Sequence, residues 1–301
     1  MTRPNTNALK SEELKRAIDD ATKRKPQRLT DLLLRFSGLP GPKPNLTLAE
    51  AVGEALAALP AREALMILAP LAADVSPPDT AGPFLCIVAA WGYAGLIRRR
   101  SNEPAAWLAL AELAADERMP VRVGTTEALA TLAARDPRGG DLLVQAMREF
   151  REIEDREIRW GSIATTLDAI TERALGNTKD RAALLEVTSD WLKEMVDARR
   201  AAERSESRRR GFLTVTQASC VFVREIHGEP DGAAWLEMEC ARAFHPDARR
   251  AFQSAIDRLA RHGSSERANV IDTISKALAT SAKPERDPTA IRWGTRRRGE
   301  R

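Results

Sequence analysis

The sequence predicts an all-α protein made of stacked antiparallel helix pairs. Aromatic residues make up only 5% of the 301 residues, with a single tyrosine, whereas β-sheets favour aromatic and β-branched side chains. No segment alternates apolar and polar residues over a length that would form a strand. Trp107, Trp191 and Trp235 lie 84 and 44 residues apart, which fits a repeat of about 42 residues.

The first 45 residues precede the predicted stack. Residues 1–37 form a basic segment with one charged helix. We expect this helix to begin at Ser11, because a serine followed by Glu12 and Glu13 is typical of a helix start. Residues 38–45 contain three prolines, and since proline cannot continue a helix, they predict an extended connector.

Residues 46–281 form the predicted repeat domain. Its first helical pattern, 46–59, ends before Pro60, and residues 76–79 mark the next break. A last helix, 265–280, would cap the stack, because a helix pair needs neighbours to bury its apolar face. The pairs are 61–73 with 82–99, 104–115 with 119–134, 138–152 with 157–174, 179–200 with 208–226, and 231–243 with 246–261.

The second helices of two pairs share one apolar face. Small or apolar residues recur at equal offsets from Val121 and from Ala248, on one side of each helix. They are Ala128, Leu129 and Leu132 in the first helix and Ala255, Ile256 and Leu259 in the second.

Both of these helices begin with a similar motif, Pro120-Val121-Arg122 in one and Pro246-Asp247-Ala248-Arg249 in the other. A unit of about 40 residues whose second helix starts in this way resembles the HEAT family of α-solenoids. The resemblance covers residues 46–281. It implies a right-handed superhelical stack of helix pairs whose second helices line a concave groove, and it implies an architecture rather than an activity.

Arginines gather near the starts of the second helices. Arginine offers forked donors that suit phosphate or carboxylate groups, and helix N-termini favour anions. Stacking would place these arginines in a row: Arg122, Arg156, Arg159, Arg208, Arg209, Arg210, Arg249 and Arg250. One interpretation is a surface that binds an acidic partner. The other is structural, with each arginine paired to an acid of a neighbouring repeat.

The net charge of +4 comes from the two ends of the chain. Residues 29–280 hold 32 Lys and Arg against 36 Asp and Glu, which argues against attraction of the whole body to nucleic acid. The basic tail, 282–301, combines one tryptophan with arginines, namely Arg292, Trp293, Arg296, Arg297 and Arg298. Such a tail suits nucleic-acid binding, a membrane surface or solubility alone.

Trp160 and Asp168 define an alternative site. Some HEAT-like solenoids are similar to DNA alkylpurine glycosylases. That resemblance implies a basic groove with an aromatic residue and an acidic residue near the lesion. Trp160 and Asp168 would take these two places beside the arginine row.

We expect no cofactor and no metal site. Cys220, His227, Cys240 and His245 lack the spacing of a zinc motif. No glycine-rich phosphate loop and no nucleophile elbow occurs in the sequence.

The cysteines and the longest apolar run indicate a cytoplasmic protein without a membrane span. Cys86, Cys220 and Cys240 are odd in number and lie in apolar segments, which is typical of reduced, buried thiols. The run 84–97 would be about 21 Å long as a helix, whereas a bilayer core is about 30 Å thick.

These features favour a binding protein, and they leave its enzymatic status open. The main hypothesis is a non-enzymatic scaffold that holds a protein or another acidic ligand in the groove of the stack. The first alternative is a nucleic-acid-binding protein of the glycosylase-like kind. The second is a structural subunit of a larger assembly, in which the apolar helix 84–97 forms the interface.

Overall fold

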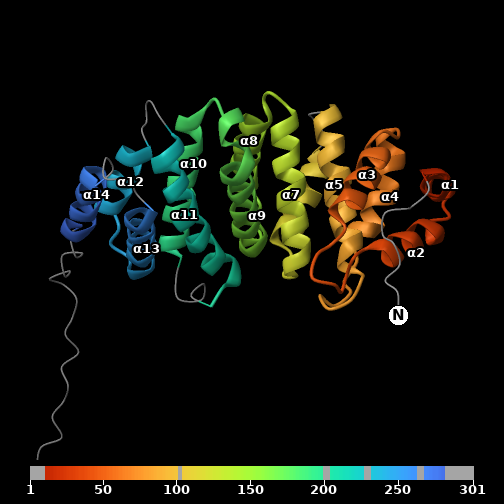
Figure 1. The fold of residues 1–301 in the computed structure, drawn as a ribbon, viewed down its shortest axis with the longest axis horizontal. Coiled ribbons are helices and arrows are strands. Elements are labelled where there is room, and N and C mark those ends of the chain that lie inside the picture. The colour runs from red at the N-terminus through yellow and green to blue at the C-terminus, as the bar shows by residue number, and fades with distance from the viewer. Residues whose placement is uncertain (1–10, 101–103, 199–203, 227–231, 263–267, 282–301) are drawn as a thin grey trace, which may run out of the picture.

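The computed structural model describes residues 11–100, 104–198, 204–226, 232–262 and 268–281. Within these ranges the regular elements are all helical and no strand occurs, as the sequence predicts. Figure 1 shows the helices following one another along the long axis. They are α1 (Ser11–Thr22), α2 (Gln27–Phe36), α3 (Leu46–Ala57), α4 (Ala61–Ala72), α5 (Pro83–Arg100), α6 (Pro104–Ala115), α7 (Met119–Arg135), α8 (Gly139–Phe150), α9 (Arg156–Ala169), α10 (Arg181–Asp197), α11 (Glu206–Glu225), α12 (Gly232–Ala241), α13 (Pro246–His262) and α14 (Ala268–Thr280).

The ends of several helices follow from their capping residues. Pro120 lies in the first turn of α7, where the missing N–H of proline costs no helical hydrogen bond. Asp155 accepts hydrogen bonds from the first turn of α9, Asp180 does the same for α10, and Ser205 does so for α11. Such side chains satisfy backbone donors that a helix leaves free. The helices from α4 onward therefore begin and end within a few residues of the predicted positions.

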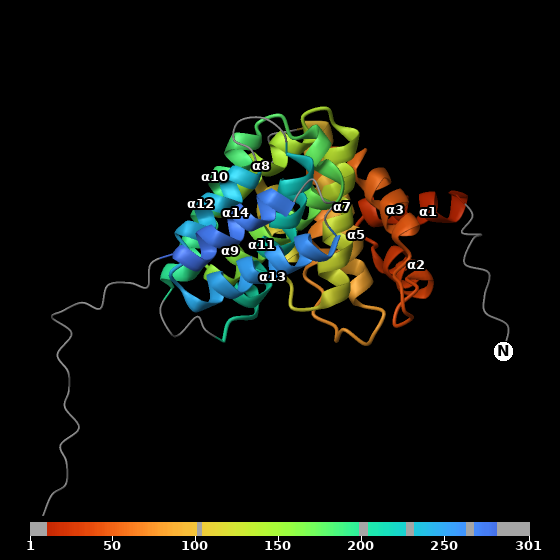
Figure 2. The same cartoon turned by 60° about the vertical axis from the view of Figure 1, so that its left-hand side comes forward.

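Alternate helices pack against one another in two rows. In one row, α3, α5, α7, α9, α11 and α13 each contact the next. In the other, α4 contacts α6, and α8, α10, α12 and α14 each contact the next. Figure 2 brings the C-terminal end forward, where α13 and α14 also lie side by side.

Several hydrogen bonds join residues that are 38 to 50 positions apart in the chain, close to the length of one predicted repeat. In most of them, a side chain of one helix bonds to the next helix but one in the chain, as between α11 and α9. Examples are Arg210 with Thr165, Thr214 with Asp168, Trp235 with Ser189, Ser205 with Glu157, and Asn177 with Ala133.

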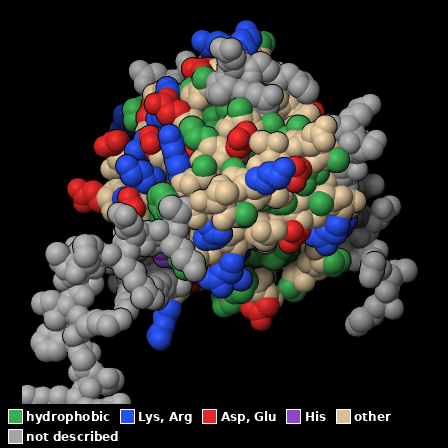
Figure 3. Space-filling model, turned by 90° about the vertical axis from the view of Figure 1, so that its left-hand side faces the viewer, with side chains coloured by type: hydrophobic (Ala, Val, Ile, Leu, Met, Phe, Trp, Pro, Cys, Tyr) green, Lys and Arg blue, Asp and Glu red, His purple; other side chains and the backbone are tan. Residues whose placement is uncertain are grey.

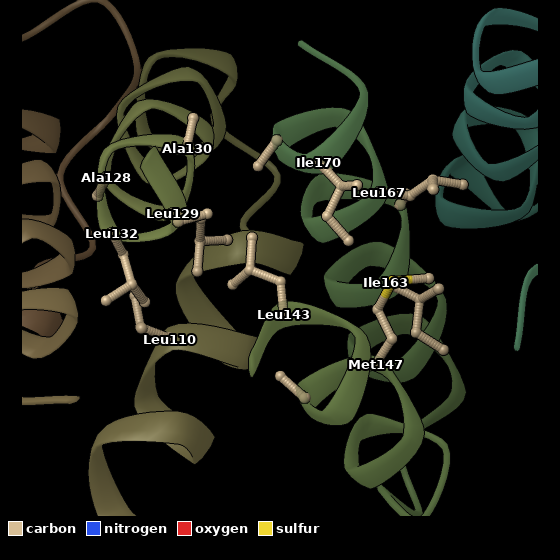
Figure 4. Close-up of a cluster of buried hydrophobic side chains, with 14 of the residues drawn as sticks. Leu110, Ala128, Leu129, Ala130, Leu132, Leu143, Met147, Ile163, Leu167 and Ile170 are labelled. Atoms are coloured by element: carbon tan, nitrogen blue, oxygen red, sulfur yellow. The ribbon is translucent and has the colours of Figure 1, made fainter. Parts of the chain in front are cut away.

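The core runs along the row as one continuous cluster. Figure 4 shows part of it, where Leu129 of α7, Leu143 of α8 and Ile163 of α9 belong to the same group of buried side chains. The apolar positions predicted from the two second helices are all buried: Val121, Ala128, Leu129, Leu132, Ala248, Ala255, Ile256 and Leu259.

Glycine allows a close approach between α3 and α5. A Cβ atom at Gly53 would lie 2.6 Å from Trp91 Cβ and 2.8 Å from the backbone nitrogen of Gly92. Backbone atoms cannot move aside as a flexible side chain can. Gly53 therefore sets how closely the two helices pack.

Helix α5 is the apolar core of the N-terminal half. All residues from Phe84 to Ile97 are buried, and α5 contacts α2, α3, α4, α6 and α7. The hypothesis that this helix forms an interface with another subunit is therefore wrong, because its own chain covers it. Among the described helices, none has both the length and the apolar character needed to cross a membrane.

The N-terminal segment contains two helices where the sequence predicted one. The break falls between α1 and α2, where Arg24 has a positive φ of 63° and Pro26 precedes the first residue of α2. The predicted connector is non-helical. Asn45 ends it by accepting a hydrogen bond from Leu48 N at 3.1 Å and donating one to Phe36 O.

The tryptophan landmarks coincide only in part. Trp107 and Trp235 are each the fourth residue of a first helix, α6 and α12. Trp107 packs on Phe150 and Trp235 on Phe222, both edge to face. Trp191 is fully buried but lies in the third turn of α10. Its equivalence with the other two tryptophans was wrong, because α10 is longer than α6 and α12.

Candidate anion-binding groove

Three of the predicted arginines have one structural role in common. Arg122, Arg159 and Arg249 are each the fourth residue of a second helix. Each donates from Nη1 to the backbone carbonyl six residues earlier, in the turn that follows the first helix. For Arg122 and the carbonyl of Asp116 the distance is 2.8 Å. These bonds satisfy carbonyl groups left free at a helix end, so these arginines hold turns together.

Some of these arginines also bond to the next helix pair. Arg159 forms an ion pair with Glu194 of α10, with 2.8 Å between Nη2 and Oε1. Arg249 donates to the hydroxyl of Ser281, which follows α14. Arg159 and Arg249 therefore each bind both the turn before their own helix and a residue of a later helix pair, as the structural interpretation predicts.

Trp160 does not face a ligand surface. Its side chain is fully buried, and its Nε1 donates to Glu194 Oε1 at 2.9 Å. Arg156 covers the ring, with its guanidinium carbon 5.1 Å from the ring centroid. The ring therefore has no open face for a flipped base, which argues against the glycosylase-like use of Trp160.

Asp168 lies apart from Trp160, beside Arg210 on α11. Thr214 donates to Asp168 Oδ2 at 3.4 Å, and Arg210 donates from Nη2 to Thr165 at 2.8 Å. Burial and the nearby Glu172 raise the pKa of Asp168 to about 6, against the opposing effects of Arg210 and Thr214. Burial, together with Arg122, lowers the pKa of Arg210 to about 10. Arg210 therefore points toward α9 and not into the groove described next.

The remaining predicted arginines line a groove between α11 and α13. Its volume is about 460 Å³. Both helices begin at the same end of the groove, at Glu206 and Pro246. Their N-terminal N–H groups and dipoles add positive potential at that end. The charged residues that line it are Arg204, Arg208, Arg209, Arg250, Glu206 and Asp247.

Arg208 is the fixed member of this group. Only 4% of the residue is exposed. Its Nε donates to Met195 O at 2.8 Å and its Nη1 to Asp247 Oδ2 at 2.7 Å, while the guanidinium lies over the Phe212 ring. Its Nη2 is buried and has no hydrogen-bond partner within the described residues. A buried donor without a partner carries a desolvation cost that an acceptor would remove.

Arg209 and Arg250 are the exposed arginines of the groove. Each side chain is 78% exposed. Arg209 binds Glu206 through two nitrogens, at 2.7 and 2.9 Å, and Arg250 binds Asp247. The hydrogen bonds from Arg209 lower the pKa of Glu206. Burial raises the pKa of Asp247, but hydrogen bonds from Arg208 and Arg250 outweigh it and lower that pKa overall.

The floor of the groove is apolar. Phe212 and Leu213 of α11 and Ala251 of α13 line it, and Leu213 is 56% exposed. The side chain of Leu213 is therefore accessible from solvent. The groove therefore combines a basic end with an apolar stretch.

A second cavity, of about 490 Å³, lies between α10, α12 and α13. Leu192, Val196 and Phe252 give it apolar walls. Two of its polar residues bond to each other, because Ser189 donates to Glu239 at 2.7 Å, and Ser189 also accepts from Trp235 at 2.9 Å. Figure 3 looks onto this end of the molecule, where basic, acidic and apolar side chains are interspersed.

The cysteines and histidines form no site in the described part of the chain. Cys86, Cys220 and Cys240 are buried free thiols. Burial raises the pKa of Cys240 to about 12, so this thiol is not an activated nucleophile. No group of His, Cys, Asp and Glu among the described residues has the geometry to hold a metal ion. His227 lies outside the described residues.

The structure brings together three of the predicted arginines, Arg208, Arg209 and Arg250, and adds Arg204. Sequence reasoning missed Arg204 because it precedes the helix. The signal was present as a cluster of four arginines within residues 204–210. The tail residues lie outside the described part of the chain, namely Arg292, Trp293, Arg296, Arg297 and Arg298. Comparisons of the chain with protein-family models, with curated proteins and with solved structures found no match.

Proposed function

We propose that this chain is a HEAT-like α-solenoid, with its helix pairs stacked in a right-handed superhelix. Three features support the proposal. Alternate helices contact one another along two rows, and hydrogen bonds join positions about one repeat apart. An arginine at the fourth position of the second helix binds the preceding turn in three of the helix pairs.

The function we propose is that of a scaffold that binds an acidic segment of a partner protein in the groove between α11 and α13. The observation that carries this proposal is the charge of the groove. Four arginines share it with two carboxylates, and two of those arginines extend into solvent. Arginine-rich surfaces of this kind attract acidic partners and orient them through forked hydrogen bonds.

Nucleic acid fits the groove less well than an acidic peptide. Glu206 and Asp247 stand among the arginines, and the body of the chain has more acidic than basic residues. A nucleic-acid backbone presents a continuous row of phosphates, which these carboxylates would repel. Trp160 is buried and offers no base-stacking surface.

The test is binding of a fluorescein-labelled glutamate-rich peptide to the full chain, followed by fluorescence anisotropy at low and moderate salt. We expect binding that weakens with salt and that is lost in the Arg209→Glu/Arg250→Glu variant. A matched control is Arg16→Glu/Arg138→Glu, since those two side chains are each 68% exposed and lie away from the groove, in α1 and just before α8.

Two results would contradict the proposal. One is equal binding by the two double variants, which would place the site elsewhere. The other is tighter binding of a duplex DNA than of the acidic peptide at the same salt concentration, which would favour the nucleic-acid alternative.

A further inference from the structure

We infer that the anion bound in the groove between α11 and α13 is a phosphate group on a serine or threonine of the partner. The inference rests on the proposed function and narrows it to one ligand chemistry. It is carried by the charge balance of the groove, by the buried Nη2 of Arg208 and by the apolar floor beside them.

The charge balance matches one phosphate. Four arginines and two carboxylates line the groove, which leaves an excess of two positive charges. A phosphorylated serine or threonine carries a charge of about −1.5 to −2 at neutral pH and three acceptor oxygens. A single glutamate or aspartate side chain would neutralise only half of the excess. A run of nucleic-acid phosphates would exceed it.

The donors of the groove also suit a phosphate. Arg208 is held in place by Met195 O and Asp247, so its guanidinium is positioned before any ligand arrives. Its Nη2 donor is buried and unpartnered within the described residues. Arg209 and Arg250 are exposed and attached to the first turns of α11 and α13. They are able to exchange a carboxylate partner for a phosphate, which offers more acceptors.

The apolar floor gives the site a direction. Phe212, Leu213 and Ala251 continue the groove away from the two helix starts, and Leu213 is 56% exposed. A peptide with its phosphate among the arginines would place a neighbouring side chain on this surface. We therefore expect a phosphoserine or phosphothreonine with an apolar residue close to it in sequence.

The test uses three fluorescein-labelled peptide libraries with randomised flanking residues and one fixed central residue, which is phosphoserine, serine or glutamate. Fluorescence anisotropy with the full chain gives the affinity for each library. We expect the phosphoserine library to bind about tenfold or more tightly than the other two. Arg209→Ala/Arg250→Ala should remove this preference, and Arg16→Ala/Arg138→Ala should retain it. Leu213→Asn should weaken binding of a phosphoserine peptide with an apolar neighbour and should leave one with a polar neighbour unchanged.

Three outcomes would overturn the inference. Equal binding of the phosphoserine and glutamate libraries would leave the acidic-partner scaffold standing without a phosphate preference. Tighter binding of a duplex DNA than of the phosphoserine library would transfer the phosphate site to nucleic acid. Binding by none of the libraries and not by a glutamate-rich peptide would remove the inference and the proposed function together.

Discussion

Two grooves at neighbouring helix starts have opposite charge. One is the groove between α11 and α13. The other, of about 520 Å³, lies where the turns before α7 and α9 meet the segment after α4. Its lining includes five carboxylates and one arginine, namely Glu112, Asp116, Glu117, Asp155, Glu157 and Arg118. Ser205 of the first region donates to Glu157 of the second at 2.8 Å, so the two grooves adjoin.

The difference lies in where the arginines point. Arg118 is 14% exposed and is bound by Asp116 at 2.7 Å and Asp74 at 3.3 Å. Arg122 donates to the carbonyl groups of Asp116 and Glu117, in the turn between α6 and α7. At α11 the inward role falls to Arg208, the third residue of the helix, and Arg209 at the fourth position is exposed. A shift of one residue on a helix turns a side chain by about 100°, and it separates a structural arginine from an available one.

The largest expected effect on stability is the difference between alanine substitutions at Arg208 and at Arg209. Arg208→Ala should lower the free energy of unfolding by about 2–4 kcal/mol, because it removes buried hydrogen bonds to Met195 O and Asp247 and the packing on Phe212. Arg209→Ala should leave the unfolding midpoint unchanged, because its ion pair with Glu206 is exposed. Urea unfolding followed by far-ultraviolet circular dichroism measures both. Equal midpoints for the two variants would break the distinction between fixed and available arginines.

Buried positions on the shared apolar face of α7 and α13 should respond alike to truncation. Leu129→Ala in α7 and Ile256→Ala in α13 should each cost about 2–4 kcal/mol, because each leaves a cavity at a buried position. The same urea titration gives the two values. A cost below about 0.5 kcal/mol at both sites, the level of a surface substitution, would mean that the shared apolar face has been assigned to the wrong residues.

A smaller effect concerns Asp168, on the helix between the two grooves. Its pKa is raised from 3.8 to about 6, chiefly by burial, so the folded protein keeps a proton that the unfolded chain has released. Its ionisation therefore destabilises the fold as the pH rises through this range. Asp168→Asn should remove about 1–2 kcal/mol of this loss at neutral pH.

The measurement for Asp168 is the difference in unfolding free energy between the two proteins at several pH values. Taking this difference removes the contributions of Glu206 and Asp247, whose lowered pKa values act in the opposite direction. We expect the advantage of Asp168→Asn to grow between pH 3.8 and about 6. A difference that stays constant over this range would show that folding does not change the pKa of Asp168.

The sequence was informative about helices and about which faces are buried. Proline in the first turn and aspartate or serine caps act locally, so α7, α9 and α11 begin close to the predicted residues. Equal spacing of apolar residues in α7 and α13 identified buried positions in both helices. The break between α1 and α2 was missed although Pro26 marks it, because a single helix was predicted for residues 1–37.

The groove was predictable only as a group of candidates. Eight arginines share a sequence position near a helix start, but their roles depend on the rotation of each helix and on its neighbours. Arg159 finds Glu194 and Arg249 finds Ser281, both from later helix pairs. Arg204 and Leu213 enter the groove through the packing of α11 on α13, which no local pattern specifies.

The most direct test of the central claim is arginine modification by phenylglyoxal, followed by mass spectrometry of the folded chain. We expect rapid modification at Arg204, Arg209 and Arg250, slow modification at Arg208 and Arg159, and protection of the rapid group by the phosphoserine library. Equal modification rates at the fixed and exposed arginines, or no protection of the rapid group, would contradict the account.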